Sequence, residues 1–311
     1  MNSSTQLLPD IDMQERITLI EETKTFIVAV SGGVDSVVLL HKLVRAMEDI
    51  PPARAPRYIV AHFDHGIRQD SSKDAEFVQE LAAQYKLHYE CGSAQLGAGA
   101  SEEAARTARY KFLRDMKAKY EAHMIITAHH QDDLIETIIL NIIRGTSPRG
   151  LSPMNAPDIL RPLINTTKAE LLDYAATHEL QWREDPSNTD QTYLRNYIRS
   201  SMLPKLDIHR EQLLSITKRI ADIYQDVDIR LSHLLPKHNL IQRSYFVRFS
   251  YGVQREMMRA WLMRNGISVT NRGIIERCVV AAKTLSHGKK IDIDERFWLC
   301  SEKDTVLIVR K

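Results

Sequence analysis

Two clusters of polar residues in the first half of the chain have types and spacings suited to phosphate chemistry. The first is Ser-Gly-Gly-Val-Asp-Ser at 31–36, directly after the apolar run 26–30. Glycines let a backbone approach an anion closely, and the start of a helix supplies free N–H donors. A carboxylate is out of place beside an anion unless a divalent cation lies between them. The predicted phosphate-binding residues are Ser31, Gly32, Gly33, Val34, Asp35 and Ser36, with Asp35 as the predicted Mg²⁺ ligand.

The second cluster is His-His-Gln-Asp-Asp-Leu-Ile-Glu at 129–136. Asp132 and Glu136 are four residues apart, and Asp133 is three residues from Glu136, so the three carboxylates lie on neighbouring parts of a helix surface. They could hold Mg²⁺ or a cationic substrate, and His129 could contact phosphate or transfer a proton. Acidic residues in a first turn also complement the helix dipole, but the dipole does not explain two histidines before the helix. The predicted catalytic residues are Asp35, His129, Asp132, Asp133 and Glu136.

The elements between these clusters alternate in type. Apolar runs at 26–30, 58–64, 87–91 and 124–129 have the length of strands. Helical patterns begin after the phosphate loop and again near residues 72, 101 and 132. Strands alternating with helices predict an α/β fold with a doubly wound parallel sheet, in which ligands bind at the carboxyl ends of the strands. Both polar clusters fall at such ends.

The chain has 311 residues, enough for two domains. We predict a catalytic domain at 1–206, a helical linker at 207–236 and a small, mainly helical domain at 237–311 that ends in a hairpin. This last segment carries 15 Lys and Arg against 7 Asp and Glu, although the net charge of the chain is only +2. The excess favours a polyanionic partner, or it forms a solvated surface.

Composition argues against several other classes of protein. Three widely spaced cysteines form no CxxC pair, so neither a zinc site nor a disulfide framework is expected. The first residues lack the pattern of a signal peptide, and no apolar stretch is long enough to span a bilayer, so a cytoplasmic location is expected. The glycines match neither a Walker A loop, which needs a following lysine, nor a dinucleotide fingerprint.

Six arginines are candidates to bind an anionic substrate or partner: Arg106, Arg109, Arg144, Arg149, Arg195 and Arg199. Arg106 and Arg109 are three apart on one predicted helix, and their alternative role is ion pairing with Glu102 and Glu103. Arg195 and Arg199 share a helix face that could grip phosphate or be simply solvated.

Seven segments in order along the chain carry a resemblance. They are SGGVDS at 31–36, HFDHGIR at 62–68, SEEAARTARYKFL at 101–113, TAHHQDDLIETIILNIIRGTSPRGL at 127–151, RPL at 161–163, EDPSN at 184–188 and RNYIR at 195–199. Together they resemble the tRNA(Ile)-lysidine synthases, which belong to the PP-loop ATP pyrophosphatases. Many members continue into a further C-terminal domain, which we expect to be absent because the chain stops at Lys311.

The resemblance implies an ATP-dependent ligase that joins lysine to C2 of cytidine 34 in the CAU anticodon of tRNA(Ile). Cytidine O2 would attack the α-phosphate of ATP and release pyrophosphate, and the lysine ε-amine would then displace AMP. The tRNA would then read AUA and be charged with isoleucine instead of methionine.

The same resemblance implies roles for the candidate residues. The loop at 31–36 would hold pyrophosphate, with Mg²⁺ on Asp35, and the carboxylates of Asp132, Asp133 and Glu136 would bind lysine or a metal. His129 would contact the α-phosphate. Arg106 and Arg109 would bind ATP phosphate, the substrate carboxylate or tRNA. The tRNA candidates are Arg144, Arg149, Arg195 and Arg199.

Three alternatives stay open at the level of sequence. A tRNA 2-thiolation enzyme would share the fold but usually needs a reactive cysteine pair. A PP-loop amidating enzyme for a small molecule would have less use for the basic C-terminal segment. A non-catalytic RNA- or nucleotide-binding module would have no need for the carboxylates.

Overall fold

The computed structural model describes residues 24–48, 50–66, 71–94, 101–154, 156–183, 194–235, 239–267 and 272–311. The chain divides into two compact units, residues 1–217 and 218–311. The boundary between them falls within the long helix α9 (Arg210–Leu234). The domain limits at residues 206 and 236 stay a prediction.

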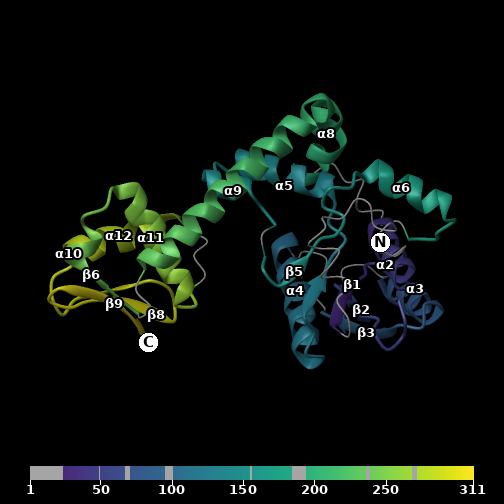
Figure 1. Cartoon of the computed structure of the whole chain (residues 1–311), viewed down its shortest axis with the longest axis horizontal. Coiled ribbons are helices and arrows are strands. Elements are labelled where there is room, and N and C mark those ends of the chain that lie inside the picture. Colours follow the sequence, from purple (N-terminus) through teal and green to yellow (C-terminus); the bar gives the residue numbers. More distant parts are fainter. Residues whose placement is uncertain are drawn as a thin grey trace. The chain divides into compact units, whose positions relative to one another are not determined.

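The first unit is built on a five-stranded parallel sheet with the strand order β3-β2-β1-β4-β5 (Figure 1). Its strands are β1 (Thr25–Ala29), β2 (Arg57–Asp64), β3 (His88–Ser93), β4 (Met124–Ile126) and β5 (Ile159–Leu160). The predicted parallel α/β sheet is therefore confirmed. Strand β5 was not predicted, because two residues carry no readable periodicity.

Helices cover both faces of this sheet. They are α2 (Val34–Met47), α3 (Ser71–Gln84), α4 (Glu102–Lys119), α5 (Gln131–Ile143) and α6 (Lys168–Thr177). In β1, Phe26 and Val28 pack in one core with residues of α2, α3 and α6, whereas Ile27 packs in another with residues of α4. Because both faces of the sheet are buried, the strand is a continuous apolar run. The strand order reverses between β1 and β4. The two polar clusters follow these two strands, so both lie at this switch in strand order.

Short helical segments follow α6 in the first unit. They are α7 (Leu194–Tyr197), the π-helical turn η4 (Ile198–Met202), α8 (Leu203–Leu206) and the 3₁₀ turn η5 (Asp207–His209). Ile198 and Leu203 are buried against Ile135 and Ile139 of α5. This packing fixes the position of Arg195 and Arg199 next to the acidic helix α5.

The second unit combines helices with a four-stranded antiparallel sheet of order β6-β9-β8-β7. Its elements are β6 (Leu240–Gln242), α10 (Arg243–Phe246), α11 (Tyr251–Arg264), α12 (Arg272–Thr284), β7 (Lys290–Asp292), β8 (Phe297–Ser301) and β9 (Thr305–Arg310). Strands β8 and β9 are the hairpin predicted at the end of this segment, and α11 and α12 are the long helices of the domain predicted to be mainly helical. The three-residue strands β6 and β7 extend the hairpin into a sheet, and Trp261 of α11 is fully buried in the core of this unit.

In the part of the chain that the structure describes, none of the helices combines the length and apolar character needed to cross a lipid bilayer.

Candidate functional site

The loop between β1 and α2 has the geometry of an anion nest. Gly32 has a φ of +92°, which L side chains rarely adopt, so this turn requires glycine. The backbone N–H groups of Ser31 and Gly32 both donate to Ser36 Oγ, each at 3.2 Å. Helix α2 begins after Gly33, which provides no side-chain cap. The turn therefore brings the hydroxyl oxygens of Ser31 and Ser36 to 3.2 Å from one another at the N-terminus of a helix, a place suited to an anion.

Asp35 lies at the mouth of this loop and joins it to two other elements. Its Oδ1 is 2.6 Å from Nζ of Lys168, the first residue of α6. Its Oδ2 is 3.6 Å from Nε2 of His130, which precedes α5. Burial raises the pKa of Asp35, but His130 and Lys168 together outweigh it and hold that pKa below its ordinary value. Asp35 is therefore a carboxylate at neutral pH.

His130 connects the two predicted clusters directly. Its Nδ1 accepts the backbone N–H of Asp132 at 3.2 Å, so Nε2 carries the ring hydrogen. That Nε2 faces Asp35 and, at 3.5 Å, Asp133 Oδ2. Burial lowers the pKa of His130, but the two carboxylates reverse the effect and leave it above its ordinary value. The sequence analysis assigned a role to His129 and none to His130.

The three predicted carboxylates of α5 are each paired with an arginine. Glu136 is completely buried, and Arg199 contacts both its oxygens, with Nε to Oε1 at 2.6 Å and Nη2 to Oε2 at 3.1 Å. Nη2 of Arg199 also lies 3.3 Å from Asp133. Nη1 of Arg210 is 2.5 Å from Asp132. Arg195 Nε is 3.5 Å from Glu136. These arginines thus face the acidic helix rather than forming a merely solvated surface.

The carboxylates differ in access. The side chains of Asp132 and Asp133 are 18% and 20% exposed, whereas that of Glu136 is 0% exposed. Burial raises the pKa of Glu136, and the arginine partners oppose that shift. A ligand can therefore reach Asp132 and Asp133 more directly than it can reach Glu136, whose oxygens already hold Arg199.

A separate cationic group surrounds His129 at the end of β4. His129 Nδ1 and Thr127 Oγ1 are 2.8 Å apart. Burial, followed by the charges of Arg161, Arg109 and Arg106, holds the pKa of His129 well below its ordinary value, so the ring is neutral at pH 7. Arg161 is buried. It lies next to Thr127, because the N–H of Thr127 donates to the carbonyl of Leu160, the residue before Arg161.

Arg106 and Arg109, two of the three arginines of α4, lie over the ring of Tyr110, with their guanidinium carbons at 4.9 and 5.4 Å from its centroid. This is a cation–π arrangement, and the described contacts of these two arginines include no ion pair with Glu103; the side chain of Glu102, the other predicted partner, lies outside the described residues. Among the residues that the structure describes, neither the buried Tyr110 hydroxyl nor the buried Arg161 Nε has a hydrogen-bond partner. Buried donors without partners are costly, so this group is suited to an anionic ligand.

The other predicted residues lie further along the chain. Arg144 is exposed at the C-terminal cap of α5, and Arg149 is half-buried in the 3₁₀ turn η2 (Pro148–Leu151). Segment 184–188 and residues 67–68 of the resemblance lie outside the described residues. Lys168, His130, Arg161 and Arg210 had no assigned role. Three of them had a signal in the sequence: Lys168 is a basic residue at a helix start, His130 is a second histidine beside His129, and Arg161 begins the RPL segment.

Asp35 fits a magnesium ion shared with a nucleotide. Mg²⁺ is usually held by one or two carboxylates together with substrate phosphates. Across the described ranges, no group of three or more His, Cys, Asp or Glu side chains is arranged to hold a metal. A single ionised carboxylate at the mouth of a phosphate loop would instead hold the ion jointly with the phosphates.

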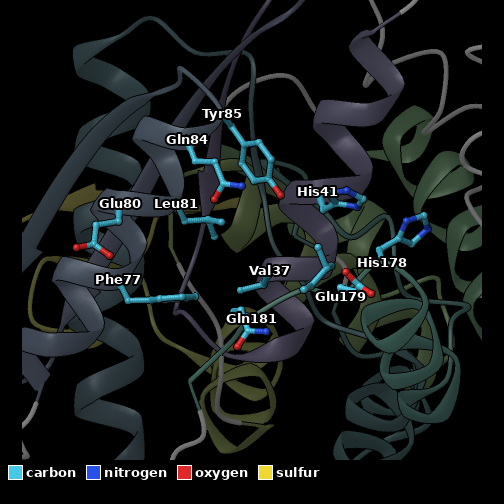
Figure 2. A pocket seen from close by; sticks show the side chains of 11 residues that line it. Val37, His41, Phe77, Glu80, Leu81, Gln84, Tyr85, His178, Glu179 and Gln181 are labelled. Carbon is cyan, nitrogen blue, oxygen red and sulfur yellow. The ribbon is translucent and has the colours of Figure 1, made fainter.

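The structure also has a cavity of about 350 Å³ next to α2 (Figure 2). Side chains from α2, α3 and residues 178–181 line it, including His41, Tyr85 and His178. None of the predicted site residues is among its lining. The candidate site is therefore the open carboxyl edge of the sheet and not this cavity.

Comparisons with known proteins match both the fold and the resemblance. A family model described as a PP-loop domain matches residues 8–206. The tRNA(Ile)-lysidine synthase of Bacillus cereus is 30% identical over 297 residues, covering 90% of this chain and 61% of that protein. The tRNA(Ile)-lysidine synthase of Thermosipho africanus is 37% identical over 201 residues, covering 61% of this chain and 45% of that protein. The chain thus spans less than two thirds of the length of these relatives.

A solved structure shares the fold at low sequence identity. It is a U34-tRNA thiolase from Methanococcus maripaludis, with a TM-score of 0.57, 15% identity and coverage of 71% of this chain and 78% of that one.

Proposed function

Because the chain belongs to the PP-loop family, we propose that it cleaves ATP between the α and β phosphates and ligates lysine to cytidine 34 of tRNA(Ile). The observation that carries this proposal is the meeting of two clusters far apart in sequence. Asp35 of the phosphate loop and Asp133 of the acidic helix both face Nε2 of His130, at 3.6 and 3.5 Å. A nucleotide on the loop would therefore lie beside carboxylates able to bind a cationic amino acid.

In the first step, cytidine O2 attacks the α-phosphate, the bond between the α-phosphorus and the bridging oxygen breaks, and pyrophosphate leaves. The N–H groups and hydroxyls of the loop would hold the leaving pyrophosphate. Mg²⁺ held by Asp35 would neutralise charge on the phosphates when bound. Arg106, Arg109 and Arg161 would face the α-phosphate, where fixed positive charge stabilises the transition state.

In the second step, the lysine ε-amine attacks C2 of the adenylated cytidine, and AMP leaves with O2. Asp132 and Asp133 are the carboxylates with access to an incoming ammonium group. Glu136 would act through Arg199 and Arg195, which it holds in place. A neutral His129 would hydrogen-bond to the α-phosphate without adding charge to the arginine group.

The target base must leave its stack to reach this edge of the sheet, as is usual for enzymes that modify a base. The exposed Arg144 and the half-buried Arg149 are the candidates to contact the anticodon loop. The excess of basic residues at 237–311 supports a second, sequence-independent contact with the tRNA backbone.

The second candidate function is 2-thiolation of a tRNA base, which the shared fold of the thiolase favours. Cys91 is exposed on the edge strand β3, and Cys278 and Cys300 belong to the second unit. The chain has only these three cysteines, so the first unit contains one and no pair. This distribution favours an amine over sulfur as the second nucleophile.

ATP labelled at the α-phosphate tests the chemistry. Incubation with isoleucine tRNA and Mg²⁺ in the absence of lysine should transfer label to the RNA, and later addition of lysine should release labelled AMP. Formation of ADP instead would contradict cleavage between the α and β phosphates. Label that leaves the RNA only when a sulfur donor is added would favour the thiolation enzyme.

A further inference from the structure

The phosphate loop lacks a positive charge of its own. Residues 31–36 contain no lysine or arginine, and the next basic residue along the chain is His41. Lys42 follows it, but Lys42 is buried and its Nζ lies 4.6 Å from the ring centroid of Tyr174. Walker A loops place a lysine on the β and γ phosphates. A loop that holds a leaving pyrophosphate with backbone dipoles and hydroxyls alone would lack that full charge.

Lys168 reaches the mouth of the loop from another part of the chain. It is the first residue of α6, which packs against α2, and Thr167 and Glu170 form a capping box that fixes this helix start. The Nζ of Lys168 lies 2.6 Å from Oδ1 of Asp35, which is only two residues after Gly33. The side chain of Lys168 is 37% exposed, so an incoming ligand can reach it.

We propose that Lys168 is the phosphate-binding lysine of this loop and contacts the β or γ phosphate of ATP and the pyrophosphate product. This inference rests on the proposed cleavage of ATP. Lys168 is held by Asp35 before the nucleotide binds and moves to a phosphate oxygen afterwards, which leaves Asp35 free to face the metal. The four-carbon stem of lysine allows that movement while the backbone stays in α6.

A purely structural role explains the pair less well. Partly exposed ion pairs contribute little to stability, and α6 already has its own cap and buries Leu171 and Ala175 in the core. The pair also shields Asp35 from the anion that the neighbouring loop is built to bind. Placing an ammonium and a carboxylate together at the same mouth is useful when both contact the same phosphate–metal group.

The test is calorimetric titration of pyrophosphate in the absence of divalent metal, using the wild-type chain and Lys168→Met. A charge-assisted hydrogen bond lost from the anion should weaken metal-free binding by about 10- to 100-fold. Lys168→Arg should recover part of the affinity because it keeps the charge. Lys111→Met, on the exposed side of α4, is the matched control and should bind as the wild type does. Thermal unfolding of each variant checks that it is folded.

Steady-state kinetics supply a second readout. Lys168→Met should raise KM for ATP by a similar factor and leave KM for lysine unchanged. Metal-free pyrophosphate binding that is equal in Lys168→Met and wild type would overturn the assignment and make Lys168 a partner of Asp35 only. A wild-type chain that binds neither pyrophosphate nor ATP would overturn the ATP chemistry itself, together with this inference.

Discussion

The pairing of Glu136 with Arg199 gives a prediction whose size follows from the structure. Glu136 is fully buried, and both of its oxygens contact Arg199. Arg199→Met would leave the carboxylate with Arg195, 3.5 Å away, as its remaining cationic partner. Removing one member of a buried ion pair costs about 3–5 kcal/mol, because the other charge stays buried.

Two features of the site reduce that cost. The Arg199 side chain is 40% exposed, so part of its charge is screened by water, and Arg195 stays close to the carboxylate. We therefore expect Arg199→Met to lower the free energy of opening of α5 by about 2 kcal/mol. Glu136→Gln should cost about 1 kcal/mol, because a neutral amide can be buried with partial hydrogen bonding and Arg199 can turn to solvent.

A double-mutant cycle isolates the interaction. The variant with both substitutions should be more stable than the sum of the single effects predicts, with a coupling of about 1–2 kcal/mol. Hydrogen exchange of the α5 amides, read by mass spectrometry, measures local opening and does not require the two units to unfold together. Arg144→Met on the exposed end of the same helix is the control, and it should change opening by less than about 0.5 kcal/mol.

Additive effects within about 0.5 kcal/mol would mean that Glu136 and Arg199 do not stabilise one another. In that case Glu136 would not be held by Arg199, and its carboxylate would be free to bind lysine directly. A coupling of the expected size, together with an unchanged KM for lysine in Glu136→Gln, would support Glu136 as a positioning residue.

Three further predictions concern the phosphate loop and His129, which follows β4. Asp35→Ala should change the free energy of unfolding by no more than about 1 kcal/mol, because the Asp35–Lys168 pair is partly exposed. The rate of AMP formation from ATP should fall by about 100-fold or more in this variant. AMP formation by Asp35→Ala at the wild-type rate would contradict a role of Asp35 in binding the metal. Gly32→Ala should lower the free energy of unfolding by about 1–3 kcal/mol because of its positive φ. Gly33→Ala, at a φ of −73°, should cost far less in the same denaturation assay, and equal costs would contradict the strain argument. Folding lowers the pKa of His129, so in acid the unfolded chain binds a proton at this residue that the folded chain does not bind. The free energy of unfolding should therefore fall as the pH drops below about 6.5, by at most about 1.4 kcal/mol per pH unit. Melting curves of His129→Asn should show a smaller loss of stability in acid than the wild type, and parallel curves would contradict a neutral buried ring.

The parallel sheet was predictable because its central strands are buried on both faces and read as continuous apolar runs. Strand β1 is such a run, and the glycines after it mark where the chain must turn. Strands β5, β6 and β7 were not predicted, because segments of two or three residues depend on neighbouring strands for their pairing. Their place in the sheets is a property of tertiary structure.

The candidate site divides along similar lines. Local spacing placed Asp133 and Glu136 near one another, and the rule for parallel sheets placed them near Asp35. The partners of those carboxylates could not be read from spacing, because Lys168 and Arg210 come from elements 133 and 78 residues away from Asp35 and Asp132. Contacts of this kind depend on how helices pack over the sheet edge, which no local pattern encodes.

Incorporation of labelled lysine into transcribed tRNA tests the proposed ligation itself. The reaction would contain ATP, Mg²⁺ and isoleucine tRNA with a CAU anticodon, and elongator methionine tRNA would serve as the control because it has the same anticodon. We expect stable incorporation of lysine at position 34 of the isoleucine tRNA only. Absence of lysine from the RNA, while ATP is still cleaved to AMP and pyrophosphate, would contradict lysine as the nucleophile.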